Sequence, residues 1–315
     1  MRVRYVTCDV FTDTRFGGNP LAVVPDARDL STAQMQAITR EFNYSESTFV
    51  LPPERGGDRR VRIFTPAREV PFAGHPNVGT AFVLARLGAL GPFDEPCTVV
   101  FEEAAGDVPV EVTPVGDGLF SCELRAPEPL SVGPDVPVDL VAAALGLDPV
   151  DVVTRTHAPR VASVGLPFMV VEVAGFRALA RARADLGALE RLAALGAVTP
   201  DIHVYTHAPG GQVGSAPGAS AVPGLVPPDL HARMFAPFDG VPEDPATGSA
   251  NAALAGLLAA LDPRADAELR WTIAQGVQMG RPSRLEARAH KRSGEVAGVW
   301  IGGQSVPVAE GVIEI

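Results

Sequence analysis

Lysine, cysteine and positive charge are all scarce in this chain of 315 residues. Lys291 is the only lysine, and its polar surroundings make it a poor candidate for the Schiff base that a pyridoxal phosphate enzyme needs. The three cysteines, Cys8, Cys97 and Cys122, form no CxxC pair and no spacing typical of a metal site. The formal net charge of -11 argues against nucleic acid or an anionic membrane as a partner.

Several common functional patterns are missing as well. No apolar run reaches the length of about 18 residues that a transmembrane helix needs, and MRVRYVTCDVF at the N-terminus is typical of a strand rather than a signal peptide. The chain has no Walker, Rossmann or G-x-S-x-G pattern. His203 and His207 have i, i+4 spacing, but in a strand or loop such a pair is seldom a metal site. We therefore expect a cytoplasmic protein that holds no metal and no organic cofactor.

The chain resembles itself at an offset of 171 positions. Residues 63–90, IFTPAREVPFAGHPNVGTAFVLARLGAL, align without a gap on residues 234–261, MFAPFDGVPEDPATGSANAALAGLLAAL, and share an F-x-P-x3-V-P preface. GNPLAVV from Gly18 likewise resembles GLPFMVV from Gly165. Each half then runs strand, connection, strand, Gly/Pro loop and apolar helix. Two similar units arising by chance are the alternative, but we favour duplication.

Duplication predicts an α+β protein of two pseudo-symmetric domains of like topology. We expect the first domain at residues 1–128, joined by residues 301–315, and the second at residues 129–300. The proline-rich residues 126–139 are the best linker, and residues 209–229 are predicted to be a flexible loop. The C-terminal tail is predicted to be a hairpin that turns at Gly302 and Gly303.

Each half places a loop-to-helix corner where backbone N–H groups at a helix N-terminus can bind a carboxylate or phosphate. The first corner offers His75, and the second offers Asp244, Thr247 and Ser249. Taken singly, these residues could be helix caps or an ordinary loop histidine. Related by a pseudo-two-fold axis, the two corners would face one cleft holding a small anion. Glu46, which precedes an apolar strand, could carry a proton in such a cleft.

Five motifs in order resemble the phenazine-biosynthesis isomerase-like (PhzF-like) family: DVFTDTRFGGNPLAVV, NYSESTFV, FTPAREVPFAGHPNVGTAF, EDPATGSANAAL and QGVQMGRPSRL. The resemblance implies the diaminopimelate-epimerase-like fold, with each sheet wrapped around a central helix, and a homodimer. It also implies a cofactor-free site that isomerises trans-2,3-dihydro-3-hydroxyanthranilate or an analogue. Matched by motif, the catalytic residues are Glu46, His75, Asp244 and Ser249. The substrate-binding residues are Gly74, Asn77, Thr247 and Gly248, and Asn77 departs from the family pattern.

Two other functions remain open. Sister enzymes on this fold are epimerases and racemases with two opposed thiols, but no cysteine lies in either corner of this chain. A non-catalytic protein that binds a small anion is the other alternative. The complete set of four catalytic residues argues against it, because a protein without turnover would be free to lose the glutamate.

Overall fold

The computed structural model describes residues 1–116, 118–196, 199–208 and 227–315. These residues form two compact units, which we call unit 1 (Met1–Arg125 with Ile301–Ile315) and unit 2 (Ala126–Trp300). Most of the loop predicted at residues 209–229 lies outside the described residues. Among the helices of the described part, none combines the length and the apolar character needed to cross a membrane.

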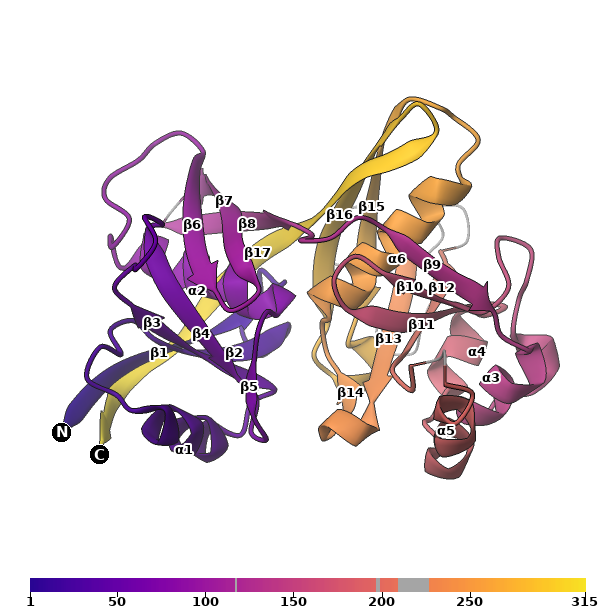
Figure 1. Cartoon of the computed structure of the whole chain (residues 1–315), viewed down its shortest axis with the longest axis horizontal. Helices are drawn as coiled ribbons and strands as arrows, with labels where there is room; N and C mark the ends of the chain where they lie inside the picture. Colours follow the sequence, from indigo (N-terminus) through magenta and orange to yellow (C-terminus); the bar gives the residue numbers. More distant parts are fainter. Residues whose placement is uncertain (117, 197–198, 209–226) are drawn as a thin grey trace. The chain divides into compact units, whose positions relative to one another are not determined.

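Unit 1 is built on a mostly antiparallel sheet (Figure 1). Its strands are β1 (Arg2–Val10), β2 (Asn19–Val24), β3 (Glu46–Leu51), β4 (Arg59–Phe64), β5 (Glu69–Val70), β6 (Cys97–Glu103), β7 (Gly106–Gly116) and β8 (Leu119–Arg125). Two pairs are parallel, β2 with β3 and β4 with β6. The last strand of the chain, β17 (Glu295–Glu314), pairs with β1 and β8 and so returns the C-terminus to this unit.

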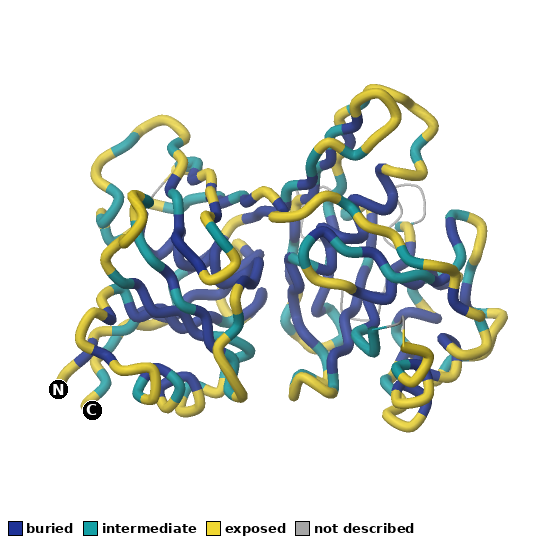
Figure 2. The backbone as a smooth tube through the Cα atoms, in the orientation of Figure 1, coloured by how far each residue is buried: buried dark blue, intermediate teal, exposed yellow. Residues whose placement is uncertain are grey.

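The two helices of unit 1 differ in their relation to the solvent. Helix α1 (Thr32–Phe42) is amphipathic and starts at the capping box that its N-cap Ser31 forms with Gln34. Helix α2 (Gly74–Arg86) is buried along nearly its whole length, packs against β1, β2, β3, β7 and β8, and is dark blue in Figure 2. Gly79 makes this packing possible, because a Cβ there would lie 2.6 Å from side-chain atoms of Leu21 and Val10.

Unit 2 contains β9 (Ser131–Asp135), α3 (Val138–Ala144), η1 (Pro149–Asp151), β10 (Arg160–Ser163), β11 (Pro167–Glu172), α4 (Phe176–Arg181), α5 (Leu186–Ala193), β12 (Ile202–His207), β13 (Leu230–Ala236), η2 (Pro237–Asp239), β14 (Val241–Asp244), α6 (Gly248–Leu261), β15 (Ala267–Gln275), η3 (Val277–Met279) and β16 (Ser283–Arg292). Its central helix is α6, which packs against β10, β11, β15 and β16 and is buried on all sides over most of its length.

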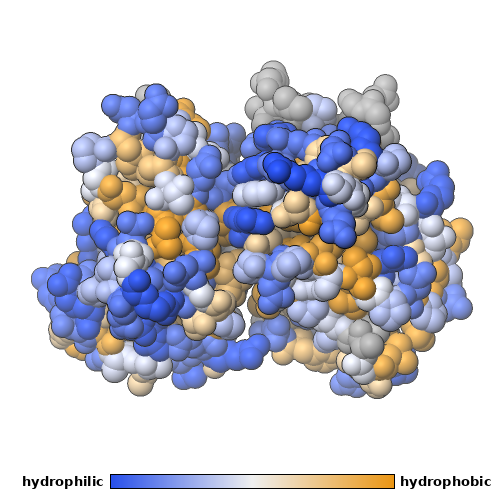
Figure 3. Space-filling view, turned by 45° about the horizontal axis from the view of Figure 1, so that its top comes forward, coloured by the Kyte–Doolittle hydropathy of each residue, from blue (hydrophilic) through white to orange (hydrophobic). Residues whose placement is uncertain are grey.

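On the face that Figure 3 presents, hydrophilic residues cover much of the surface, with hydrophobic patches between them.

The strand pairings of the two units follow the same order. In unit 2, β11 and β12 are parallel, as are β13 and β15, and these pairs correspond to β2–β3 and β4–β6 of unit 1. The registers correspond too. Phe64 of β4 faces Ser47 of β3, and Phe235 of β13, which lies 171 positions after Phe64, faces Ile202 of β12. The 171-position offset from the sequence therefore describes strands β4 and β13 correctly.

Beyond these strands the ungapped alignment is wrong by three residues. Ile63 faces Val70 in unit 1, whereas Met234 faces Asp244 in unit 2. The turn η2 lengthens the second hairpin, so the central helices begin at Gly74 and Gly248, which are 174 positions apart. This shift changes which residues of the two corners correspond.

Two further predictions need correction. The tail is one continuous strand, β17, and not a hairpin. Gly302 serves a close approach rather than a turn, because a Cβ there would lie 2.6 Å from the carbonyl oxygen of Cys122 in β8. The predicted linker at residues 126–139 contains β9, which pairs with β10.

Candidate active site

The first corner brings Glu46 and His75 together within unit 1. Glu46 is the first residue of β3, and His75 is the second residue of α2, directly after Gly74. Glu46 Oε2 lies 3.7 Å from His75 Nδ1. The His75 side chain is 5% exposed and that of Glu46 is 19% exposed, so the carboxyl retains access to solvent while the ring is enclosed.

His75 is neutral near pH 7, because burial lowers its pKa to about 3. The contact with Glu46 is therefore not an ion pair at that pH. Ser45 Oγ donates to Asn19 Oδ1 at 3.0 Å, and Asn19 Nδ2 lies 3.4 Å from His75 Nδ1. The other ring nitrogen, Nε2, is buried and has no hydrogen-bond partner in the described structure. A neutral ring carries its proton on one of its two nitrogens, so Nε2 can serve a ligand as a donor or as an acceptor.

The side chain of Asn77 forms a hydrogen bond to the backbone at the start of helix α2. Its side chain is fully buried, and Nδ2 donates to the carbonyl oxygen of Ala73, the N-cap of α2, at 3.0 Å. The sequence predicted Asn77 to contact substrate. The structure places it in the first turn of α2 with its amide nitrogen bonded to the backbone.

A carboxyl that the sequence analysis did not single out lies beside Asn77. Glu103, the last residue of β6, is 4% exposed, and neither carboxyl oxygen has a hydrogen-bond partner of ordinary geometry among the described residues. Burial raises the pKa of Glu103 to about 8, and the neighbouring Asn77 amide offsets part of this rise. Glu103 is therefore predominantly protonated at pH 7.

The second corner, within unit 2, brings Asp244 and Thr247 together. Asp244 ends β14, and Thr247 is the N-cap of α6. Thr247 Oγ1 donates to Asp244 Oδ2 at 2.5 Å, and both residues are buried. Gly248 is the first residue of α6 and Ser249 the second, so Ser249 occupies the place that His75 takes in α2. Ser249 is partly exposed.

A buried glutamine ties this corner to the neighbouring strand. Gln275, the last residue of β15, accepts through Oε1 from Thr247 N at 3.2 Å and from Asn251 Nδ2 at 2.7 Å. Its Nε2 donates to the carbonyl oxygen of Asp244 at 2.8 Å and to Thr247 Oγ1 at 3.0 Å. Asn251 Nδ2 also donates to the carbonyl oxygen of Thr247 at 2.9 Å, the same bond that Asn77 makes in α2.

The histidines and cysteines that were considered for other chemistry lie elsewhere in the fold. His203 is buried in β12 with Nε2 bonded to Asn251 Oδ1 at 3.0 Å, whereas His207 ends the same strand and is exposed. Cys8, Cys97 and Cys122 lie in β1, β6 and β8, and all three are free thiols. All three cysteines therefore lie in strands and outside both helix corners.

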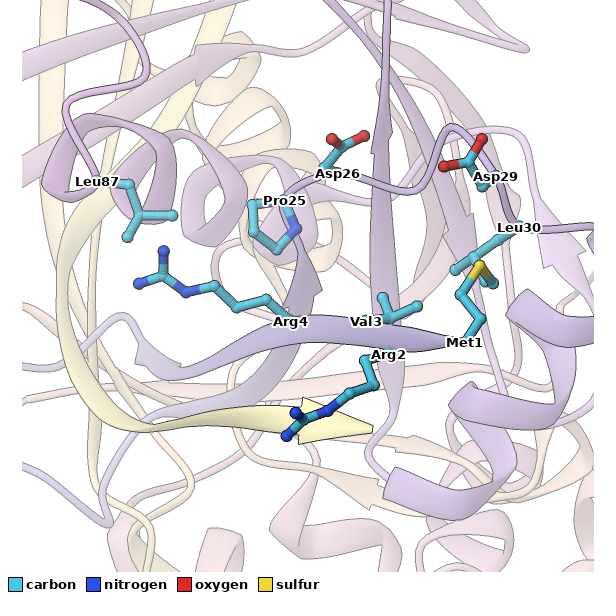
Figure 4. Close-up of a pocket in the computed structure, with 9 residues that line it drawn as sticks. All are labelled: Met1, Arg2, Val3, Arg4, Pro25, Asp26, Asp29, Leu30 and Leu87. Atoms are coloured by element: carbon cyan, nitrogen blue, oxygen red, sulfur yellow. The ribbon is translucent and has the colours of Figure 1, made fainter. Parts of the chain in front are cut away.

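A hollow of about 400 Å³ opens on unit 1 near the N-terminus (Figure 4). It is lined by the start of β1, by residues that precede α1 and by Leu87, with Arg2, Arg4, Asp26 and Asp29 at its walls. None of the predicted site residues belongs to it. We therefore place the candidate chemistry at the corners and not in this hollow.

Sequence reasoning missed Asn19, Asn251, Gln275 and Glu103. The sequence does carry a signal for Asn251. The helix starts GHPN and GSAN both have asparagine at the fourth position, and an alignment at an offset of 174 positions would have matched Asn251 with Asn77. Each corner also contains the N-terminus of a buried helix, the positive end of the helix dipole, which favours an anionic ligand. The first corner adds a carboxyl suited to moving a proton, and the second adds Asp244 and Ser249.

Comparison with known proteins gives a consistent set of relatives. The phenazine biosynthesis-like protein family matches residues 8–311. The chain is 39% identical over 318 residues to an uncharacterized isomerase from Mesorhizobium japonicum, with 99% of this chain and 98% of that protein covered. It is 37% identical over 312 residues to the trans-2,3-dihydro-3-hydroxyanthranilate isomerase of Pseudomonas aeruginosa, with 98% of each chain covered.

Solved structures agree with this set. A phenazine biosynthesis protein of the PhzF family from Bacillus anthracis matches with a TM-score of 0.85 at 23% identity, covering 100% of both chains. A predicted epimerase from Pseudomonas aeruginosa matches with a TM-score of 0.76 at 31% identity, covering 99% of both. A hydroxyproline epimerase from Agrobacterium vitis shares the fold more distantly, with a TM-score of 0.59 at 14% identity over 99% of this chain and 92% of that one.

Proposed function

The chain belongs to the phenazine biosynthesis-like (PhzF) family and is an isomerase, and from this premise we propose that it shifts a proton and a double bond on a small carboxylate. Glu46 removes a proton from an activated carbon, the electron pair moves into the conjugated system, and Glu46 returns the proton to another carbon. The sum is an isomerisation that consumes no co-reactant. The proposed substrate is trans-2,3-dihydro-3-hydroxyanthranilate or an analogue, because a relative 37% identical carries that name.

The observation that carries this proposal is the 3.7 Å separation of Glu46 Oε2 and His75 Nδ1 at the start of α2. One carboxyl that both removes and returns a proton works best when its pKa lies near the pH of the reaction. A neutral His75 puts no positive charge beside Glu46 that would favour the ionised carboxylate. In the proposal, Nε2 of His75, which has no partner in the described structure, carries the proton of the neutral ring and donates it to a hydrogen bond with a polar group of the substrate.

The second corner has a binding role in the proposal. Asp244 accepts a hydrogen bond from a polar group of the substrate, and Ser249 with the first N–H groups of α6 holds its carboxylate. Gly74, Thr247 and Gly248 contribute backbone around the ligand. We also propose that the chain works as a homodimer without metal or cofactor, as the sequence resemblance implies, and that it is cytoplasmic, since its three sparse cysteines suit a reducing compartment.

Solvent exchange tests the proposal directly. We expect the wild-type protein to convert trans-2,3-dihydro-3-hydroxyanthranilate in deuterated water and to leave deuterium on carbon, whereas a protein that only binds the compound would leave none. Glu46→Gln should lose about 10²–10⁴-fold in single-turnover rate, the usual contribution of general acid–base catalysis, while binding persists. Glu41→Gln, on the exposed end of α1, is the matched control and should keep the wild-type rate. A Glu46→Gln protein of near wild-type rate would exclude Glu46 as the proton carrier.

An epimerase with two thiols is the second candidate function on this fold. Its chemistry needs two cysteines at opposed positions. The lack of a cysteine in either helix corner weighs against it. Inversion of a stereocentre without a double-bond shift would favour it instead.

A further inference from the structure

We infer that Gln275 is a positioning residue of the second corner, which fixes the orientation of the Asp244 carboxyl through the hydroxyl of Thr247. The inference rests on the proposed role of Asp244 in binding the substrate. Gln275 itself stays fully buried behind the corner and is not a catalytic residue.

The direction of each hydrogen bond follows from the donors available. Gln275 Oε1 faces two N–H donors, from Thr247 and Asn251, so the oxygen and nitrogen of the Gln275 amide are assigned without ambiguity. Its Nε2 must then donate to Thr247 Oγ1, at 3.0 Å. A hydroxyl that accepts there turns its own proton toward Asp244 Oδ2, at 2.5 Å. The chain of donation runs in one direction, from Gln275 to Thr247 to Asp244.

The same glutamine fixes the backbone on which Asp244 is carried. Gln275 Nε2 also donates to the carbonyl oxygen of Asp244 at 2.8 Å. Both the main chain and one carboxyl oxygen of Asp244 are therefore held by hydrogen bonds that lead back to Gln275 in strand β15. A misplacement of about 1 Å at a reacting or binding group can cost about 10²-fold in rate, so this bracing has a measurable consequence.

Substitutions at two links of the chain test the inference. Gln275→Leu removes all four bonds of the amide, and Thr247→Val removes only the hydroxyl. We expect each to lower kcat on trans-2,3-dihydro-3-hydroxyanthranilate by about 10²-fold. Thr247→Ser keeps the hydroxyl and should restore kcat to within about threefold of wild type. The Thr247 hydroxyl reaches the Asp244 carboxyl as part of the same chain of hydrogen bonds that begins at Gln275, so the double variant should lose little more than Gln275→Leu alone.

Ser283→Ala is the matched control. Ser283 Oγ donates to the carbonyl oxygen of Pro245 at 2.9 Å, so this variant also removes a buried bond to the same segment, but not one that leads to the Asp244 carboxyl. We expect it to keep kcat within about threefold. A loss in Ser283→Ala equal to that in Gln275→Leu would mean that any damage to the segment suffices, and would overturn the inference.

Asp244→Asn separates this inference from the proposed function. If Asp244→Asn is as active as wild type, the proposed role of Asp244 is wrong. Asp244→Asn could be inactive while folded Gln275→Leu and Thr247→Val keep full kcat. In that case Asp244 acts without the hydrogen bonds from Gln275 and Thr247, and the positioning role is wrong. Thermal unfolding of each variant shows which proteins are folded. Should Gln275→Leu not fold, Thr247→Val against Thr247→Ser decides the question alone.

Discussion

Glu103 in unit 1 and Gln275 in unit 2 occupy the same position of the repeated sheet. Each ends the strand that runs parallel to its partner, β6 beside β4 and β15 beside β13, and each lies beside the asparagine in the first turn of the central helix. Gln275 has four hydrogen bonds there, whereas the carboxyl oxygens of Glu103 have no partner of ordinary geometry among the described residues and only the Asn77 amide nearby. A protonated glutamate side chain has nearly the same shape as glutamine. A buried, neutral Glu103 can therefore take the position that the uncharged amide of Gln275 occupies in unit 2.

This relationship predicts how stability changes with pH. The pKa of Glu103 rises from 4.5 in the unfolded chain to about 8 in the folded protein. Between these values the folded state holds a proton that the unfolded state has lost, so the free energy of unfolding falls as pH rises from 4.5 to 8 and levels off above 8. The full change is on the order of 5 kcal/mol at about 1.4 kcal/mol for each pKa unit.

Glu103→Gln removes that titration and should be more stable than wild type at pH 8, with the difference shrinking toward pH 5. Urea unfolding of both proteins across this range measures it. Glu111→Gln, on the exposed face of β7, is the control and should run parallel to wild type. The nearby Arg55 donates from Nη2 to the backbone carbonyl oxygen of Glu103 and to the side-chain carboxyl of Asp107, and it makes no hydrogen bond to the Glu103 carboxyl. Parallel curves for Glu103→Gln and wild type would contradict the protonated state.

The ring of His75 is expected to remain neutral from pH 8 down to pH 5. Its folded pKa of about 3 lies far below the ordinary value of 6.5, so between these values the unfolded chain binds a proton that the folded protein does not, and the free energy of unfolding falls as pH drops from 6.5 toward 3. Nitrogen-15 spectra of the histidine side chains, with His75→Gln used to assign the signals, report the ring directly. A protonation of His75 near pH 6.5 would show that the ring is hydrated or paired with an ionised Glu46.

The cysteines should be dispensable for activity. Cys8 and Cys122 are buried in strands, and burial raises the pKa of both thiols, which makes them weak acids and poor nucleophiles. We expect a protein with Cys8→Ala, Cys97→Ser and Cys122→Ala to keep its turnover, at some cost in stability from the two buried sites. Turnover is compared at a temperature where circular dichroism shows both proteins folded. Lost turnover with an intact fold would favour thiol chemistry.

Local chemistry in the sequence was enough to locate several elements. Helix α1 begins after Ser31, because the capping box of Ser31 and Gln34 lies within four consecutive residues of the sequence. Glu46 and His75 were named from motifs, and they meet because β3 and α2 are each anchored by apolar neighbours. Their catalytic roles remain predictions.

What the sequence could not supply was register between distant segments. The partners of Gln275 lie 24 to 31 positions earlier in the chain, so its role becomes visible only when β15 is placed beside β13 and α6. The ungapped repeat failed for a related reason, since the length of a hairpin turn such as η2 is free to change while the strands on either side keep their pairing. A Gly-Gly pair is also ambiguous, because glycine serves tight turns and close approaches of backbone equally well.

That ambiguity yields the last prediction. Gly302→Ala would place a Cβ 2.6 Å from the carbonyl oxygen of Cys122 and 2.8 Å from the Cα of Glu123, so β17 and β8 would have to separate. We expect a loss of about 1–3 kcal/mol in the free energy of unfolding, the usual cost of overpacking. Gly187→Ala in α5 is the matched control, because its Cβ would meet nothing closer than 3.7 Å and alanine favours a helix by up to about 1 kcal/mol. Urea unfolding of both variants measures the contrast. Equal stability of Gly302→Ala and wild type would mean that β17 does not run this close to β8, and a turn at Gly302 and Gly303 would again be the better description of the tail.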